Sequence, residues 1–190
     1  SNALEVPITA ARVGFVAKSL GETCDLLQMT IESLKKRATE TSFELHKGIY
    51  YRKAGLDTTG KVVALFSGQG SQYLEMGRQL ALNFPLLRQA HADMDKVLLK
   101  EGLSPISNVV FPCPVFDKAQ QEAQVVALQQ TENAQPAIGT FSMGLYKILQ
   151  QAGFRPDFVA GHSFGELTAL WSAGVLSDED YLFLAQARGQ

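Results

Sequence analysis

A serine between two glycines is the residue of this sequence whose surroundings point most clearly to chemistry. Ser163 is the third residue of Gly-His-Ser-Phe-Gly at positions 161–165, which fits the pattern G-x-S-x-G. An apolar stretch at 158–160 predicts a strand before it, and residues 164 to about 173 predict a helix after it. A serine on such a turn projects its hydroxyl away from the backbone, and the helix N-terminus favours a developing oxyanion. The pattern therefore predicts a nucleophilic serine, with a serine N-cap flanked by packing glycines as the structural alternative.

The elements that must hold this turn follow from the apolar pattern and the turn residues. Residues 61–66 form an apolar run short enough for a buried parallel strand, and a glycine-rich turn follows them. Ser177, with Asp180 three residues later, predicts a capping box for the last helix. The other helices are expected at 73–82, from a start at Asn83 and Pro85 to Gly102, from a cap at Asp117 to about 130, and from Pro136 to Gly153, with an irregular stretch at 104–116. Strands that alternate with helices predict an α/β fold with a parallel sheet.

The first part of the chain predicts a separate, small α/β unit. Residues 1–3 read Ser-Asn-Ala, which is typical of the remnant of a cleaved tag and is left out of the fold prediction. Strands are expected at 12–17 and 48–53, with a helix between them from Ser19 or Thr23 to about 38. A turn-rich break at 55–60 places the boundary between a first unit, residues 4–60, and a second, residues 61–190.

The composition excludes several classes of protein. Of the 190 residues, 46% are hydrophobic and 19% are charged, which predicts a folded core rather than disorder. The net charge of −2 and the lack of a basic run beyond residues 35–37 argue against nucleic acid as a partner. No apolar stretch reaches membrane-spanning length and no signal peptide is visible, so we expect a cytoplasmic protein with no membrane partner. Cys24 and Cys113 lack C-x-x-C spacing, so we expect buried free thiols and neither a disulfide framework nor a metal site.

Four segments in this order resemble the malonyl-CoA:ACP transacylase family. Residues 161–166 resemble the GHSxGE motif of that family, and Ser-Gly-Gln-Gly-Ser-Gln at 67–72 resembles its GQGSQ loop. The segment Glu-Asn-Ala-Gln-Pro-Ala at 132–137 resembles the one that leads into the helix before the nucleophile strand. Arg188 stands in the Ala-Arg-Gly context where the family keeps an arginine. The resemblance covers roughly residues 61–190 and implies the N-terminal part of an α/β-hydrolase-like acyltransferase core.

The function that this resemblance implies is transfer of a malonyl-type acyl group, malonyl or methylmalonyl, from CoA to the phosphopantetheine thiol of an acyl carrier protein. Ser163 would hold the acyl group as an ester between the two steps. The backbone N–H groups of Phe164 and Gln69 would form the oxyanion hole, with Gly68 and Gly70 letting the loop approach closely. Arg188 would bind the free carboxylate of the acyl group through its planar guanidinium. No bound metal or cofactor is implied besides the acyl-CoA substrate and the phosphopantetheine of the partner.

The kind of parent protein is indicated by two further resemblances. The proline-containing stretch at 104–116 looks most like that of iterative synthases that make polyunsaturated fatty acids, and it is also similar to that of enediyne-type synthases. Residues 4–60 resemble, in order and pattern, the linker that joins a ketosynthase to an acyltransferase in such synthases. An adjacent ketosynthase domain is therefore expected as a neighbour.

A general base for Ser163 is not among the predicted site residues. The three histidines of the chain are His46, His91 and His162. His162 directly precedes Ser163, so its ring should point away from the hydroxyl, while His91 is expected to pack or lie at the surface and His46 lies in the first unit. In the family the base histidine comes from a later segment than residue 190. The resemblance thus implies an incomplete domain, which alone would turn over very poorly and tend to self-associate through an uncovered sheet.

Two other functions remain as alternatives at this point. An esterase of the α/β-hydrolase type also uses G-x-S-x-G, but it does not explain the glycine loop at 67–72 or Arg188. A non-catalytic linker or scaffold is the second alternative. A phosphate-binding role for the glycine loop is excluded, because neither a Walker lysine nor G-x-G-x-x-G spacing is present.

Overall fold

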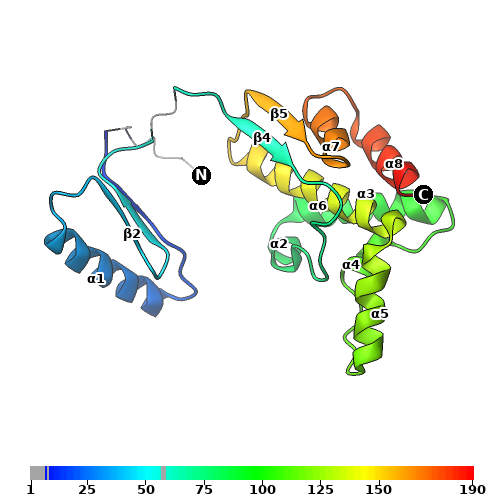
Figure 1. Cartoon of the computed structure of the whole chain (residues 1–190), viewed down its shortest axis with the longest axis horizontal. Helices are drawn as coiled ribbons and strands as arrows, with labels where there is room; N and C mark the ends of the chain where they lie inside the picture. The colour runs from blue at the N-terminus through cyan, green and yellow to red at the C-terminus, as the bar shows by residue number, and fades with distance from the viewer. Residues whose placement is uncertain (1–6, 8, 57–58) are drawn as a thin grey trace. The chain divides into compact units, whose positions relative to one another are not determined.

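The computed structural model describes residues 7, 9–56 and 59–190 of the chain (Figure 1). The chain divides into two compact units, of which the first ends at Gly60 and the second begins at Lys61. Within the described residues, no helix combines the length and the apolar character that crossing a membrane requires.

The first unit combines an antiparallel sheet with one helix. Its elements are β1 (Arg12–Gly14), α1 (Leu20–Lys36), β2 (Ser42–Leu45) and β3 (Ile49–Arg52). The strand order is β1-β3-β2, and both pairings are antiparallel. Ser19 caps α1 as predicted, because its side chain accepts a hydrogen bond from the Glu22 N–H. Leu26 of α1, Phe43 of β2 and Ile49 of β3 are buried and supply the apolar core of this unit.

The strand prediction for this unit was incomplete. The strand expected at 12–17 ends at Gly14, and β2 was not expected. β2 is only four residues long and buries Phe43 between two exposed neighbours, Ser42 and Glu44. One buried position in so short a segment gives too little alternation to indicate a strand.

The second unit is a mixed α/β structure built on a parallel pair of strands, which confirms the predicted fold class. β4 (Val63–Phe66) and β5 (Phe158–Gly161) pair in register, with Val63 opposite Phe158 and Phe66 opposite Gly161. The helices of this unit are α2 (Arg78–Asn83), α3 (Pro85–Lys100), α4 (Ile106–Val110), α5 (Lys118–Gln129), α6 (Thr131–Gln151), α7 (Gly165–Ser172) and α8 (Asp178–Gly189). Because the strands are parallel, the loops that follow them meet at one edge of the sheet.

The core of the second unit lies around α6. This helix runs beside the two strands, and both α3 and α8 pack against it (Figure 1). Gly144 allows α3 to come close, since a Cβ at this position would lie 2.3 Å from Leu87 Cδ1. On the other side of α6, Tyr146 contacts Trp171 edge to face, and Trp171 stacks on Tyr181. The elements that follow β5 are thus fixed to a central helix.

The helices before α5 differ in three places from the sequence prediction. The helix expected at 73–82 begins only at Arg78, because Glu75 and Gly77 adopt φ values of 63° and 73° that a helix does not tolerate. Asn83 ends α2 and does not cap α3, whose N-cap is Phe84. The stretch expected to be irregular contains α4, which buries Ile106 and Val110 at i, i+4 spacing.

The helix expected to start at Pro136 begins five residues earlier, at Thr131. Pro136 is the sixth residue of α6 and removes one backbone hydrogen bond, and the helix nevertheless continues through it. The carbonyl of Pro136 also accepts a 2.7 Å hydrogen bond from the Thr140 hydroxyl. As a result, residues 131–135 form the first turns of α6 and face the loops that follow the strands.

The two cysteines were expected to be buried, and this prediction is wrong. Cys24 and Cys113 are both free thiols with exposed side chains. Cys24 lies on the solvent side of α1, and Cys113 lies between two prolines in the segment before α5. The Cys113 backbone is held to α5, where Gln124 Nε2 donates to its carbonyl oxygen at 2.9 Å, but its side chain stays exposed, so hydrophobic character alone did not bury either thiol.

Candidate active site

Ser163 occupies a strained turn between β5 and α7. Its φ is 54°, in the left-handed region that a residue with a side chain seldom adopts. The residue is exposed, whereas Phe164 and Gly165 on its helix side are buried. At this sharp turn the Ser163 side chain projects away from the backbone, as the G-x-S-x-G spacing predicts.

The two glycines of this turn are required because backbone atoms touch them. A Cβ on Gly161 would lie 2.0 Å from the carbonyl carbon of Gly165, and one on Gly165 would lie 2.2 Å from the carbonyl oxygen of Phe66. The N–H of His162 donates a 3.1 Å hydrogen bond to that same Phe66 oxygen. The end of β4 thus packs directly against the turn and fixes the position of the turn relative to the sheet.

The glycine loop that follows β4 packs directly on the serine turn. A Cβ on Gly68 would lie 2.5 Å from the His162 carbonyl oxygen and 3.3 Å from Ser163 Cβ. The loop is held by its own side chains, because the Ser71 hydroxyl donates to the Gly68 carbonyl oxygen at 2.9 Å. The N–H of Gly70, at a φ of 107°, donates to the Gln72 side-chain oxygen at 2.8 Å. Gly68 therefore allows the close approach, whereas Gly70, with nothing within 4 Å of a Cβ placed on it, supplies the positive φ of the loop.

Two backbone N–H groups at this edge have no protein acceptor. In residues 59–190, neither the N–H of Gln69 nor that of Phe164 donates a hydrogen bond within the chain. The N–H of Gly70, in contrast, is bound to Gln72. Phe164 is also the N-cap residue of α7, so the partial positive charge of that helix end acts at the same place. The two predicted oxyanion-hole donors are thus among the backbone N–H groups that have no acceptor in residues 59–190, and their role stays a prediction.

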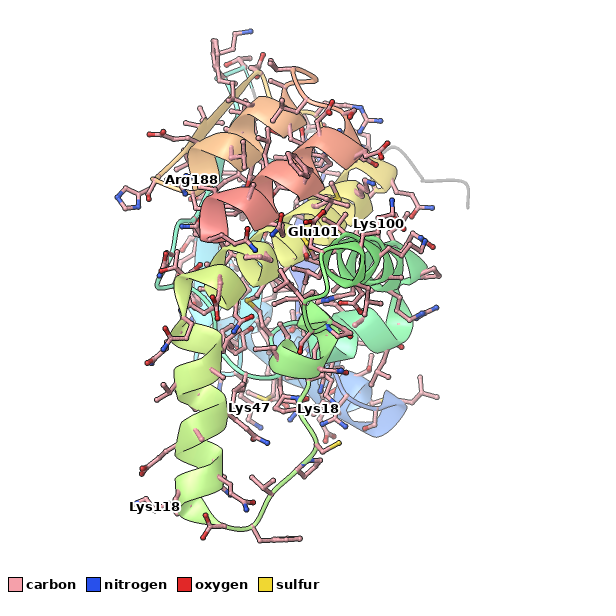
Figure 2. The ribbon with its side chains drawn as sticks, turned by 90° about the vertical axis from the view of Figure 1, so that its right-hand side faces the viewer. Lys18, Lys47, Lys100, Glu101, Lys118 and Arg188 are labelled. Carbon is pink, nitrogen blue, oxygen red and sulfur yellow. The ribbon has the colours of Figure 1, made fainter. Side chains whose placement is uncertain are left out.

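Arg188 lies close to the C-terminal end of α8 (Figure 2). Its guanidinium carbon is 5.8 Å from the centroid of the buried Phe164 ring. Its Nη1 donates to the Gln135 side-chain oxygen at 3.2 Å. α8 approaches α6 here because Gly189 has no side chain, and a Cβ on it would lie 3.1 Å from Glu132 Cα. Across the described ranges of the chain, no carboxylate forms an ion pair with Arg188, so its charge is available to a ligand.

A buried glutamine in the first turns of α6 was missed at the level of sequence. Gln135 is only 7% exposed, and its amide contacts both Arg188 and Gln69. The signal that could have found it is the segment at 132–137, which was noted without a role for any residue. A helix start placed at Pro136 left Gln135 outside the helix, so its direction could not be deduced.

The histidines do not provide a partner for the serine hydroxyl. In the part of the chain described here, no hydrogen bond joins Ser163 to His162, whose ring lies beside the glycine loop. His91 is packed on Phe111 and 5% exposed, and burial lowers its pKa although Asp95 acts to raise it. His46 lies between β2 and β3 of the first unit and is exposed.

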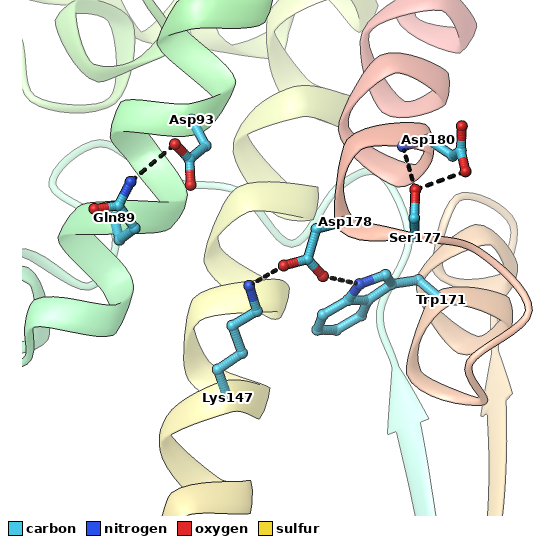
Figure 3. A network of polar contacts seen from close by, with 7 residues as sticks. All are labelled: Gln89, Asp93, Lys147, Trp171, Ser177, Asp178 and Asp180. Carbon is cyan, nitrogen blue, oxygen red and sulfur yellow. Dashed lines mark hydrogen bonds and ion pairs between the residues drawn. The ribbon is translucent and has the colours of Figure 1, made fainter.

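Polar contacts behind the turn tie α7 and α8 to α6. Figure 3 shows the Asp178 carboxylate accepting hydrogen bonds from Trp171 Nε1 and from Lys147 Nζ. The Tyr181 hydroxyl donates to the Gly139 carbonyl oxygen at 3.2 Å and contacts the Thr168 hydroxyl at 2.8 Å. These bonds hold the helix that follows Ser163 and the helix that carries Arg188 on one scaffold.

Comparison with known proteins gives a consistent result for the second unit. Residues 63–190 match the family model described as "Acyl transferase domain". Over 184 residues, or 94% of its length, the chain is 34% identical to a polyunsaturated fatty acid synthase subunit of Thraustochytrium sp.. It is 35% identical over 130 residues, or 68% of its length, to the malonyl CoA-acyl carrier protein transacylase of Bacillus subtilis.

Among solved structures, the chain is similar to the acyltransferase domain from the second module of the salinomycin polyketide synthase. The two share a TM-score of 0.73 and 31% identity over 96% of this chain. The chain spans 38% of that structure. It spans 37% of the Bacillus subtilis transacylase and 6% of the Thraustochytrium synthase protein.

Proposed function

The chain belongs to the acyl transferase domain family, and we propose that it carries the nucleophile half of a malonyl-type acyltransferase. In the first step the Ser163 oxygen attacks the thioester carbonyl of acyl-CoA, the C–S bond breaks, and CoA leaves as the thiol. In the second step the phosphopantetheine thiol of an acyl carrier protein attacks the serine ester and regenerates the hydroxyl. The name of the Bacillus subtilis relative, a malonyl CoA-acyl carrier protein transacylase, supports this choice of carriers.

The observation that carries the proposal is the edge where the serine turn and the glycine loop meet. Ser163 is exposed at a φ of 54°, and the loop packs so close to it that a Cβ on Gly68 would lie 3.3 Å from Ser163 Cβ. The unused N–H groups of Gln69 and Phe164 belong to these two segments. They would stabilise the negative charge on the tetrahedral oxygen, and such a donor is worth about 10²- to 10³-fold in rate.

Arg188 is the feature that selects the acyl group in this proposal. A guanidinium with no carboxylate partner in the described chain suits the free carboxylate of a malonyl or methylmalonyl group. A simple esterase gives no reason for a cation fixed beside the oxyanion residue Phe164. The general base is proposed to be a histidine from a segment that follows these 190 residues in sequence.

The parent protein is proposed to be a polyketide or polyunsaturated fatty acid synthase that works in the cytoplasm. The similarity to the Thraustochytrium synthase protein extends through both units, which supports a role for residues 4–60 as the linker from a ketosynthase. The proposed partners are therefore acyl-CoA, an acyl carrier protein and an adjacent ketosynthase domain. The chemistry needs no metal or bound cofactor, because serine, N–H donors and arginine supply each role.

Transfer of a labelled malonyl group tests this function. A version of the protein extended through the later histidine is incubated with labelled malonyl-CoA and a carrier protein. Label is expected on the carrier that bears phosphopantetheine and not on the same carrier without it. Faster cleavage of a neutral p-nitrophenyl ester than of malonyl-CoA would favour the esterase alternative, and no reaction with either would favour the scaffold.

A further inference from the structure

A line of three hydrogen bonds runs from Arg188 through Gln135 and the loop residue Gln69 to Thr131. Arg188 Nη1 donates to Gln135 Oε1 at 3.2 Å, and Gln135 Nε2 donates to Gln69 Oε1 at 3.3 Å. Gln69 Nε2 in turn donates to the Thr131 hydroxyl at 3.2 Å. The four side chains come from α8, from α6 and from the loop after β4, so one line of polar contacts crosses the whole candidate site.

The direction of this line is fixed at its arginine end. A guanidinium only donates, so the oxygen of the Gln135 amide must face Arg188. The NH₂ group of Gln135 then faces Gln69 and requires the oxygen of that amide as its acceptor. The remaining NH₂ of Gln69 is left for Thr131, whose hydroxyl can accept. If the Gln135 amide were reversed, its NH₂ group would face the Arg188 guanidinium, and two donors would meet. Only one orientation of the amide therefore allows all three hydrogen bonds.

Gln135 is the rigid member of the line. It is 7% exposed, whereas Arg188, Gln69 and Thr131 are exposed residues. In the described part of the chain, the Gln135 oxygen is also the only acceptor of a hydrogen bond from the Arg188 guanidinium. An arginine side chain has several rotatable bonds, so a buried acceptor that holds it reduces the conformational entropy lost when a ligand binds.

The chemical nature of this acceptor matters as much as its position. An amide oxygen orients the guanidinium without cancelling its charge. A carboxylate in the same place would form an ion pair with Arg188 and compete with an acyl carboxylate. The Phe164 ring, the other group in contact with the guanidinium, is likewise uncharged. The site thus holds a cation in place and leaves its charge for the ligand.

We propose that Gln135 is a positioning residue that orients Arg188 for the carboxylate of the acyl group, with Gln69 and Thr131 anchoring its amide. The inference rests on the proposed acyl transfer and adds a second function to Gln69, whose side chain anchors while its backbone N–H serves the oxyanion. Selectivity for a carboxylated acyl group is accordingly set jointly by Arg188 and by a neutral amide on another helix.

Two substitutions of Gln135 separate orientation from charge. Gln135→Met keeps the length of the side chain but removes both hydrogen bonds. Gln135→Glu keeps the shape and places a carboxylate against the guanidinium. Thr140→Val is the matched control, because Thr140 is a fully buried residue of the same helix whose hydroxyl donates only to the Pro136 carbonyl oxygen.

The measurement is kcat/KM for malonyl-CoA and for acetyl-CoA in the extended protein, with thermal unfolding of each variant alongside. We expect the malonyl-to-acetyl ratio to fall about 10- to 100-fold in both Gln135 variants, mainly through a higher KM for malonyl-CoA. The loss should be larger for Gln135→Glu, and the ratio should be unchanged in Thr140→Val. An unchanged ratio in Gln135→Glu, or equal losses for both substrates, would overturn the positioning role.

Failure of the positioning role of Gln135 can be distinguished from failure of the proposed acyl transfer itself. If the wild-type protein is not acylated by malonyl-CoA at Ser163, the acyltransferase proposal fails before Gln135 is tested. If the wild type is acylated and prefers malonyl-CoA, only the ratio in the variants decides the role of Gln135. Should Gln135→Met unfold at the assay temperature, the isosteric Gln135→Glu gives the decision.

Discussion

The edge of the sheet that carries Ser163 and the helix packing behind it are built on opposite principles. At the edge, Ser163 has a positive φ, and two backbone N–H groups have no acceptor within residues 59–190. Behind it, the side chains of Trp171, Asp178 and Tyr181 all have hydrogen-bond partners. Strain and free donors persist only where surrounding structure enforces them. The satisfied region therefore serves as the support that lets the edge remain strained and open.

Single substitutions in the two regions should therefore have different effects. Substitutions at the edge should alter acylation activity. They should lower stability only where the new side chain clashes with a backbone atom. Changes behind it should alter stability and leave the chemistry of the edge largely intact. The following variants test the two sides of the contrast, and Gly165→Ala affects both because it pushes a backbone atom.

The largest effect is expected from Ser163→Ala. Loss of the nucleophilic oxygen should lower acylation by malonyl-CoA at least about 10³-fold, because the alanine side chain has no oxygen with which to form the ester. The unfolding temperature should stay close to that of the wild type, since the Ser163 side chain forms no hydrogen bond within the described residues. Labelling by radioactive malonyl-CoA at an undiminished rate would contradict the assignment.

Gly165→Ala should damage both properties. The new Cβ would lie 2.2 Å from the Phe66 carbonyl oxygen, so β4 and the serine turn must separate. We expect a loss of about 3 kcal/mol in the free energy of unfolding, together with loss of acylation. Gly14→Ala is the control, because nothing lies within 4 Å of a Cβ there. Normal activity and stability in Gly165→Ala would show that the close contact at the turn is not needed.

Arg188→Ala should change selectivity at the edge. Removal of the guanidinium should lower kcat/KM for malonyl-CoA about 10- to 100-fold, the typical worth of a hydrogen bond to a charged group. Acetyl-CoA has no carboxylate, so its kcat/KM should change little. Parallel assays with the two substrates measure the ratio. Equal losses for both would mean that Arg188 has a structural role through Phe164.

Asp178→Asn should produce the smallest effect and only on stability. Burial acts to raise the pKa of Asp178, but hydrogen bonds from Lys147 and Trp171 lower it below 3.8 overall. A lowered folded pKa contributes stability above 3.8 that is lost as the pH falls through the folded value. At neutral pH the variant should lose less than about 1 kcal/mol, since the Lys147 pair is partly exposed.

Urea unfolding at neutral pH and again below the pKa of Asp178 checks this prediction. The difference between Asp178→Asn and the wild type should shrink at the lower pH, and acylation at neutral pH should be retained. Asp93→Asn removes an exposed pair with Lys96 on α3 and serves as the control. A difference that grows at low pH would contradict the direction of the pKa shift.

The sequence predicts the turn at Ser163 better than it predicts the packing of α6, α7 and α8 behind it. The turn at Ser163 depends on two glycines within five residues, and the Asp117 and Ser177 caps depend on one neighbouring turn, so local spacing is informative. Gln135 and Arg188 are 53 residues apart in sequence and meet only because α6 and α8 pack together. No local pattern encodes such a contact. Because the prediction started the helix at Pro136, which lies inside α6, it could not indicate the direction of the Gln135 side chain.

Errors at other positions have the same origin. The left-handed conformations of Glu75 and Gly77 delay α2, although the apolar pattern continues through this stretch. The backbone N–H of Ser107, near the start of α4, donates to the Asp95 carboxylate, which lies on a different helix. Tertiary contacts thus decide helix boundaries wherever propensity is weak.

Peptide mass spectrometry after incubation with malonyl-CoA tests the central claim most directly. The extended protein is trapped at short times, digested and searched for the malonyl group. The account predicts a malonyl ester on Ser163 that disappears when carrier protein bearing phosphopantetheine is added. Transfer to the carrier with Ser163 unmodified, or with the acyl group found on the exposed thiol of Cys113 instead, would contradict it.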